Sequence, residues 1–106
     1  MYAIVDIETT GTNAGHHGIT EVAIYIHDGN KVTDHWSSLI NPKSEIPLFI
    51  QQMTGITNEM VATAPTFEEV AAEIYHLLHP HIFVAHNAGF DYGFIKAQLA
   101  ENGYDL

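Results

Sequence analysis

AIVDIETTG, residues 3–11, is the stretch that decides the fold of this chain. Its apolar, β-branched start predicts a strand over residues 2–6 that is covered on both faces, and its Thr-Thr-Gly end predicts a turn. Alternate side chains of a strand share a face, so Asp6 and Glu8 are expected to point the same way. Two carboxylates on one face, at the carboxyl end of a strand, are suited to holding a hard divalent cation.

Two more strands follow the first one in the sequence. They are predicted over residues 21–26 and 31–40, and the His-Asp-Gly-Asn tetrapeptide between them is a strong signal for an antiparallel hairpin. A proline then opens a short helix over residues 47–52, which Gly55 ends, and a second short helix spans residues 57–61. The first half of the chain is therefore expected to be a three-strand meander followed by two helical turns.

The clearest helix in the sequence begins after Thr66. Thr66 and Glu69 have the spacing of a capping box, in which each side chain accepts a hydrogen bond from the other residue's backbone, and Pro80 stops the helix. One face of this helix is apolar and is expected to lie in the core: Phe67, Val70, Ala71, Ile74, Leu77 and Leu78.

A second continuous apolar run, residues 82–85, predicts the fourth strand, and Asn87 is expected to cap a last helix over residues 90–101 that ends at Gly103. The helical crossover before the fourth strand lets that strand lie parallel to the first. The predicted fold class is therefore α/β, with a mixed sheet in which one parallel strand joins an antiparallel three-strand meander. Ligands collect beyond the carboxyl ends of parallel strands in such sheets, and Asp91 joins the two earlier acids there.

The composition limits the classes of function. Thirteen acidic residues against three basic ones give a net charge of -10, which opposes binding to a membrane surface and direct electrostatic capture of nucleic acid. A phosphate-bearing substrate would need metal ions to mask this charge. The absence of cysteine excludes disulfides, thiolate catalysis and cysteine-zinc sites. With no signal-peptide pattern and no apolar run of membrane-spanning length, a cytoplasmic protein that does not bind membranes is expected.

The chain is rich in histidine, with eight of them, but none has the spacing of a metal-binding motif. His16 and His17 are expected to lie on the surface of a polar, Gly-rich loop over residues 12–18. The main effect expected of most of the histidines is a dependence of stability on pH.

Two segments resemble sequence motifs of one enzyme family. DIETTG, residues 6–11, and VAHNAGFD, residues 84–91, are similar to the first and second exonuclease motifs of the DnaQ-like, or DEDDh, 3′-5′ exonucleases. That family includes the proofreading epsilon subunit of bacterial DNA polymerase III and ribonuclease T. Segments between the two motifs also resemble the family in order and spacing, among them INP at residues 40–42, TGIT at 54–57 and FEEV at 67–70.

The resemblance implies a ribonuclease H-like fold and hydrolysis of phosphodiesters from a nucleic-acid 3′ end with two divalent ions, Mg²⁺ or Mn²⁺. Asp6 and Glu8 would be metal ligands, with Asp6 bridging both ions, and Asp91 would act from the second motif. Repulsion among these three catalytic carboxylates is expected to raise the pKa of at least one of them when no metal is bound. The substrate-binding residues that the motifs imply are Thr9, Thr10, Gly11, His86, Asn87 and Phe90. For Phe90, packing in the core and stacking on a base both stay open.

The family also has a third motif, His-x4-Asp, which supplies a general base and a fourth acid on a later helix. His86 and Asp91 match this spacing, but their position after an apolar strand identifies them with the second motif. Residues 1–106 are therefore expected to be the N-terminal portion of one exonuclease domain, truncated before its last strand and helices. A general base contributes about 10²–10⁴ in rate, so this fragment alone is expected to show weak metal binding and negligible turnover.

Two alternatives to a DNA exonuclease of the proofreading or repair type stay open. One is a non-catalytic nucleic-acid-binding or scaffolding module of the same fold, and the other is an RNA-trimming exonuclease. The expected partners are single-stranded nucleic-acid 3′ ends, with DNA favoured over RNA, and polymerase or other nuclease domains of a longer protein. A sheet that ends at its fourth strand leaves an apolar edge, which predicts self-association.

Overall fold

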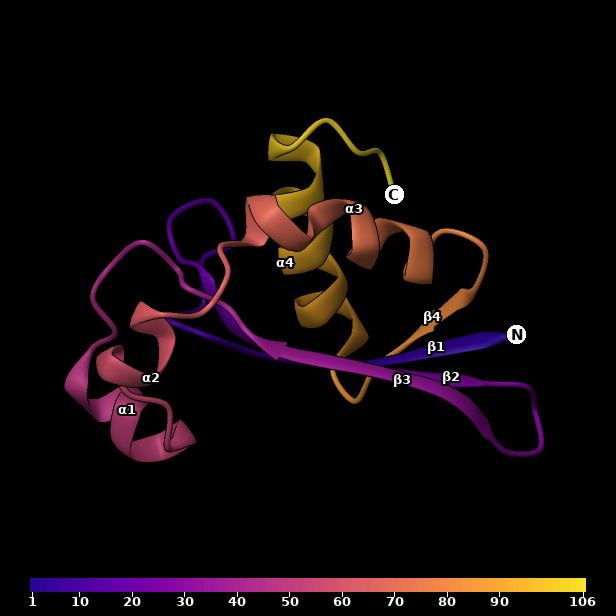
Figure 1. Ribbon diagram of the computed structural model, residues 1–106, viewed down its shortest axis with the longest axis horizontal. Helices are drawn as coiled ribbons and strands as arrows, with labels where there is room; N and C mark the ends of the chain where they lie inside the picture. The colour runs from indigo at the N-terminus through magenta and orange to yellow at the C-terminus, as the bar shows by residue number, and fades with distance from the viewer.

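The computed structural model describes residues 1–106. It contains a four-stranded sheet with the strand order β3-β2-β1-β4, together with four helices (Figure 1). The strands are β1 (Tyr2–Thr9), β2 (Ile19–His27), β3 (Val32–Leu39) and β4 (Ile82–Val84). The helices are α1 (Leu48–Thr54), α2 (Asn58–Ala62), α3 (Phe67–Leu78) and α4 (Ala88–Glu101). No helix has the length and apolar character that crossing a membrane requires.

Strand β1 lies between an antiparallel neighbour and a parallel one. It pairs antiparallel with β2 and parallel with β4, and β2 pairs antiparallel with β3. The mixed sheet predicted from the sequence is therefore confirmed. Strand β1 ends at Thr9 rather than at residue 6, because its ladder with β2 continues until Thr9 lies opposite Ile19. Asp6 and Glu8 consequently lie within the strand and not beyond its end.

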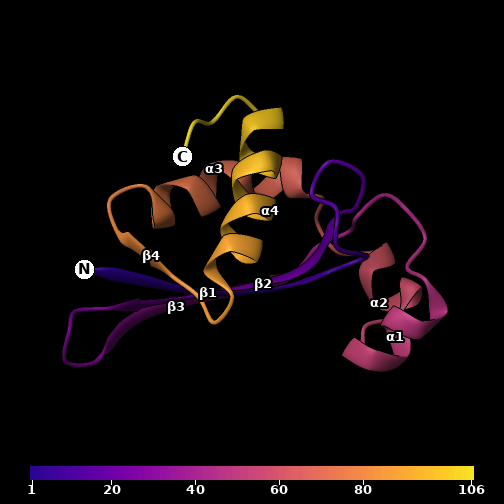
Figure 2. The ribbon, with the colours of Figure 1, turned by 180° about the vertical axis from the view of Figure 1, so that it is seen from behind.

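Helices α3 and α4 cover one face of the sheet, as Figure 1 shows from one side and Figure 2 from the opposite side. The predicted capping box is present at the start of α3, where the Thr66 backbone N–H donates to the Glu69 carboxylate at 3.0 Å. The inward side chains of both helices and of the strands form the main core, a cluster of 15 buried residues. Among its fully buried side chains are Ile24, Ile74, Phe94, Ile95 and Leu99.

Helices α1 and α2 form a small lobe beyond the end of the sheet (Figure 1). Gly55 ends α1 in the left-handed conformation, with φ 78°, and the Thr57 side chain accepts a hydrogen bond from the Met60 N–H at the start of α2. Both ends agree with the sequence prediction. This α1–α2 lobe has its own lobe cluster of buried side chains: Ile46, Ile50, Ile56 and Val61.

The start of α4 corrects one expectation. Asn87 occupies the N-cap position, but its side chain makes no capping hydrogen bond, and the helix begins at Ala88 rather than at residue 90. The Asn87 backbone has ψ 75°, which is not the extended conformation from which an N-cap side chain reaches the first turn. At the other end Gly103 has φ 85°, and the Tyr104 N–H donates to the Leu99 carbonyl at 2.9 Å, as a glycine C-cap requires.

The second face of the sheet carries no helix (Figures 1 and 2). Its exposed apolar side chains are Tyr2, Ile4, Tyr25, Ile82 and Val84. Two of them, Ile82 and Val84, belong to β4, which is an edge strand. The apolar edge that the sequence predicted is therefore present.

Candidate active site

Asp6 and Glu8 lie on one face of β1, as the period of a strand predicts. The alternating residues Val5 and Ile7 are buried in the main core, so the two acids are directed to the open face. In the register with β2, Glu8 lies opposite Glu21. Strand β1 therefore presents two carboxylates near its carboxyl end, and the Glu8 carboxylate has that of Glu21 beside it.

Asp91 lies in the first turn of α4 and is 6% exposed. Phe94 and Leu99 anchor α4 in the main core, and this packing sets where the first turn of the helix lies. Burial raises the pKa of the Asp91 carboxyl group, the negative charge of Asp6 raises it further, and His86 acts in the opposite direction. Asp91 is thus within electrostatic reach of Asp6, although the two residues are far apart in the sequence.

The pKa of Glu8 is raised as well. Burial is the largest cause, followed by the charges of Asp6, Glu21 and Asp91. Glu21 is an acid that the motifs did not reveal, and the hairpin register that places it opposite Glu8 is the signal that would have found it. A bound cation would relieve the repulsion in such a cluster of carboxylates.

The acids do not form a ready-made metal site. No group of three or more histidine, aspartate or glutamate side chains has an arrangement that could hold a metal ion. The donor atoms themselves are carboxylate oxygens, the ligand type that Mg²⁺ and Mn²⁺ prefer. The chemistry of the donors therefore fits a hard divalent ion.

A groove of about 510 Å³ lies beside Glu8. Four of the residues predicted to bind substrate line it: Thr9, Thr10, Gly11 and Phe90. The other two, His86 and Asn87, do not line the groove, and both are exposed between β4 and α4. The other hollow in the surface, of about 300 Å³, contains none of the predicted site residues.

The groove has two walls of different origin. One wall is the end of β1 with the loop that follows it, and the other is α1, from which Phe49 and Met53 project 68% and 74% exposed. Phe90 packs on Phe94, with ring centroids 5.0 Å apart, and also lines the groove, so its packing against the core is present and stacking on a base stays a prediction. Apolar and aromatic side chains around a groove are suited to the flat face of a nucleobase.

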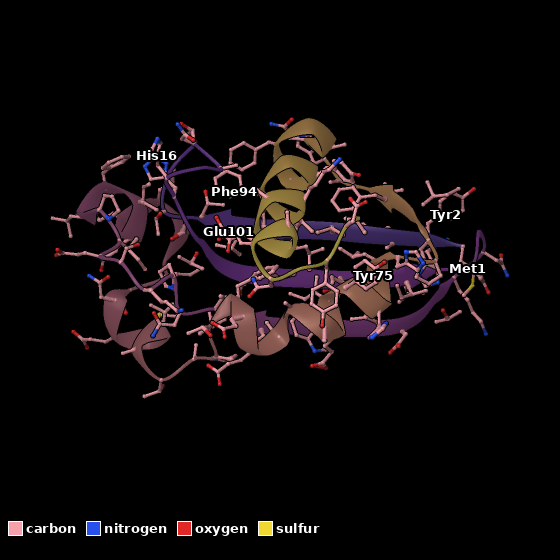
Figure 3. The ribbon with its side chains drawn as sticks, turned by 90° about the horizontal axis from the view of Figure 1, so that it is seen from above. Met1, Tyr2, His16, Tyr75, Phe94 and Glu101 are labelled. Atoms are coloured by element: carbon pink, nitrogen blue, oxygen red, sulfur yellow. The ribbon has the colours of Figure 1, made fainter.

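Hydrogen bonds hold the loop wall in place. The Thr10 N–H donates to the Gly18 carbonyl at 2.9 Å, and the Gly18 N–H donates to the Thr10 hydroxyl at 3.1 Å. Gly11 fits here because a Cβ at this position would lie 2.6 Å from the His17 ring. His17 is partly exposed on this loop, as expected, and it lines the groove. His16 is exposed, and Figure 3 shows it at the end of the molecule opposite Met1 and Tyr2.

Comparison with known proteins identifies the family. The model of the exonuclease family RNase_T matches residues 3–106. The chain belongs to this exonuclease family. The match covers both motifs that carry the resemblance to DnaQ-like exonucleases, and it confirms that resemblance.

The chain is far shorter than the curated relatives that it matches. It is 42% identical to the 3′-5′ exonuclease DinG of Bacillus subtilis (strain 168) over an alignment of 107 positions, which covers 99% of this chain and 11% of that protein. It is 43% identical to the DinG of Staphylococcus haemolyticus (strain JCSC1435) over 105 residues, 99% of this chain and 12% of that protein. The chain therefore spans about a tenth of the length of these relatives.

Solved exonuclease structures share the fold. Exonuclease X in complex with 5′ overhanging duplex DNA has a TM-score of 0.75 and 32% identity, covering 90% of this chain and 54% of that one. The metal-free form of the E. coli ExoI–ssDNA complex has a TM-score of 0.88 and 20% identity, covering 98% of this chain and 24% of that one. The second likeness concerns the fold alone. Together they confirm the predicted ribonuclease H-like sheet.

Proposed function

We propose that this chain is the part of a metal-dependent 3′-5′ exonuclease that carries the first two catalytic motifs. The supporting observation is the electrostatic coupling of Asp6, Glu8 and Asp91, which come from a strand and a helix, beside a groove. Membership of the exonuclease family and the names of the relatives favour the same reaction class. The reaction is hydrolysis of a phosphodiester bond at the 3′ end of a strand.

The carboxylates are proposed to hold two divalent ions, Mg²⁺ or Mn²⁺. When bound, these ions supply charge neutralisation at the transferring phosphate and a nucleophile at neutral pH. Asp6 and Glu8 from β1 and Asp91 from α4 are the residues that would hold these ions. The net charge of -10 makes cations a requirement for bringing a phosphate to this surface.

The groove is proposed to hold the terminal nucleotide. The backbone of residues 9–11 lines one side of it, and Phe49, Met53 and Phe90 offer apolar surface to a base. Stacking of this kind accepts any base, which suits an enzyme that removes successive nucleotides regardless of sequence.

His86 and Asn87 lie outside the groove and are proposed to contact the strand farther from its end. DNA is favoured over RNA as the substrate, because two of the structures that share the fold are complexes with DNA. Contacts with the sugar 2′-hydroxyl are what would distinguish RNA.

The general base and the fourth acid are proposed to come from a further part of a longer protein. Within residues 1–106 the His-x4-Asp spacing occurs at His86 and Asp91, and these belong to the second motif. The DinG relative, of which the match covers 11%, has ample length for a third motif. Residues 1–106 alone are therefore expected to release no measurable mononucleotide from single-stranded DNA.

A titration with Mn²⁺, followed by NMR of the 106-residue chain, tests the metal site. Paramagnetic broadening is expected first at the amides of Asp6, Glu8 and Asp91, and Asp6→Asn is expected to weaken it. The matched control is Asp105→Asn, since Asp105 is exposed and lies in the C-terminal tail. If Asp6→Asn and Asp105→Asn show equal broadening, or if the broadening falls on other amides, the metal site is refuted. Either result favours the alternative of a binding module without metal.

We also propose that the chain associates with a second copy of itself through β4. An edge strand has unpaired N–H and C=O groups, and Ile82 and Val84 add exposed apolar surface to it. Sedimentation at rising protein concentration is expected to show a dimer that Ile82→Lys abolishes. A monomer at every concentration would contradict the proposal.

A further inference from the structure

His17 is held in the groove wall by the loop on which it lies. Its backbone N–H donates to the Asn13 carbonyl at 2.8 Å, and its Nδ1 accepts a hydrogen bond from the Asn13 N–H at 3.0 Å. The imidazole ring lies against Gly11, close enough that a Cβ there would be 2.6 Å from it. These contacts fix the position of the ring and not only that of the backbone.

The hydrogen bond at Nδ1 also fixes the tautomer. A nitrogen that accepts a hydrogen bond cannot carry the proton of a neutral imidazole, so the proton is on Nε2. His17 therefore places one N–H donor on a ring of fixed position in the groove wall.

Two other potential side-chain donors around the groove are already used. The Thr9 hydroxyl donates to the Gly11 carbonyl at 2.6 Å, and the Thr54 hydroxyl donates to the Ile50 carbonyl at 2.8 Å. No lysine or arginine lines the groove. A ligand with acceptor atoms that enters between the apolar side chains therefore meets His17 as an oriented donor.

We propose that His17 is a positioning residue whose Nε2–H donates a hydrogen bond to an acceptor atom of the nucleotide seated in the groove. The inference rests on the proposed function, since it requires a nucleotide there. Its role is to orient the nucleotide between α1 and the end of β1, beside Glu8. His17 itself takes no part in breaking the bond.

Binding of thymidine 5′-monophosphate to the 106-residue chain in the presence of Mg²⁺, measured by NMR chemical-shift titration, tests the inference. In His17→Asn the amide Oδ1 replaces Nδ1 as the acceptor for the Asn13 N–H, but nothing replaces the Nε2–H donor. Loss of one hydrogen bond is expected to weaken binding about three- to tenfold. The neighbouring His16→Asn, at an exposed position, is expected to leave the affinity unchanged.

A second variant separates donation from a purely structural role. In His17→Gln an amide N–H can reach the place of Nε2, so the affinity is expected to recover part of the loss seen in His17→Asn. Unchanged hydrogen-exchange protection of the Thr10 amide, which donates to the Gly18 carbonyl, in the free His17→Asn protein would show that the loop is kept. Equal affinity of His17→Asn and the unsubstituted chain overturns the inference, and so does equal weakness of the asparagine and glutamine variants.

The outcomes also distinguish this inference from the proposed function. If the chain binds the nucleotide and His17→Asn binds it equally well, the inference fails and the proposed groove remains. If the unsubstituted chain does not bind the nucleotide, the inference and the groove both fail. The Mn²⁺ titration decides separately whether the acids bind metal.

Discussion

The two walls of the groove belong to regions that are held by very different amounts of core. The wall formed by β1 and its loop continues into the main core, which contains 15 buried residues. The wall formed by α1 belongs to the α1–α2 lobe, whose cluster contains four. Figure 1 shows the lobe beyond the end of the sheet, away from α3 and α4. One wall is therefore rigid and carries the acids, whereas the other can open locally.

This difference suits the proposed use of the groove, which is to admit and release a nucleotide. The carboxylates need fixed positions, because small displacements of catalytic groups are costly. The apolar wall needs only to close on a base, and Phe49 and Met53 are exposed enough to adapt to different ones. The larger core thus holds the proposed catalytic acids in fixed positions. The smaller core leaves the side chains of the proposed base contact free to adapt.

The largest effect is expected from a cavity in the main core. Ile74 of α3 is fully buried there, so Ile74→Ala should lower the free energy of unfolding by about 2–5 kcal/mol. Denaturant unfolding followed by circular dichroism measures this change. Leu48→Ala, at a position 69% exposed, is the control and should change stability by no more than about 0.5 kcal/mol.

A smaller and more local effect is expected in the lobe. Ile50→Ala removes a buried side chain from the lobe cluster, which the lobe can lose by opening without unfolding the sheet. The amides of α1 should exchange with solvent faster, and those of β1 should keep their protection. Native-state hydrogen exchange measures both sets of amides in one experiment. If β1 and α1 lose protection together, the lobe is not a separate unit and the comparison between the walls is wrong.

The sequence predicted most of the helices and strands because the signals for them are local. The Asp-Gly hairpin, the Thr66–Glu69 capping box and Gly55 each act over a few residues, and the structure confirms them. Asn87 shows the limit of such signals. It occupies the predicted cap position, but its backbone conformation, which neighbouring packing can impose, leaves the cap bond unmade.

The groove could not be predicted in full, because its walls meet only after folding. Phe49 and Met53 are apolar residues of a short helix and belong to no motif, and nothing near them in the sequence indicates the loop that they face. The contact of the His17 ring with Gly11 could not be predicted, since it depends on the closure of the loop. Glu21 required the register of β2 against β1. Each feature that the sequence did not reveal is a contact between segments that forms only on folding. None of them results from a wrong interpretation of a local sequence pattern.

The smallest expected effect concerns the acids of the rigid wall. In the folded chain, burial and the charge of Asp6 raise the pKa values of Glu8 and Asp91 above their ordinary 4.5 and 3.8. A raised pKa means that the folded state binds protons more readily than the unfolded state, so these two groups oppose folding at neutral pH. Their unfavourable contribution should disappear as the pH falls through the raised values toward the ordinary ones.

Replacing Asp6 by asparagine should therefore stabilise the metal-free chain slightly at pH 7, because it removes a shared cause of both shifts. The gain should shrink as the pH falls toward 4 and the remaining acids take up protons. Carboxyl NMR titration should show the Asp91 pKa moving down toward its ordinary value in Asp6→Asn, and staying in place in the control Asp105→Asn. Because the acids belong to the rigid wall, amide exchange in α1 should be the same in both variants. An Asp91 pKa that Asp6→Asn leaves unchanged would mean that the strand acids and the helix acid do not share one site.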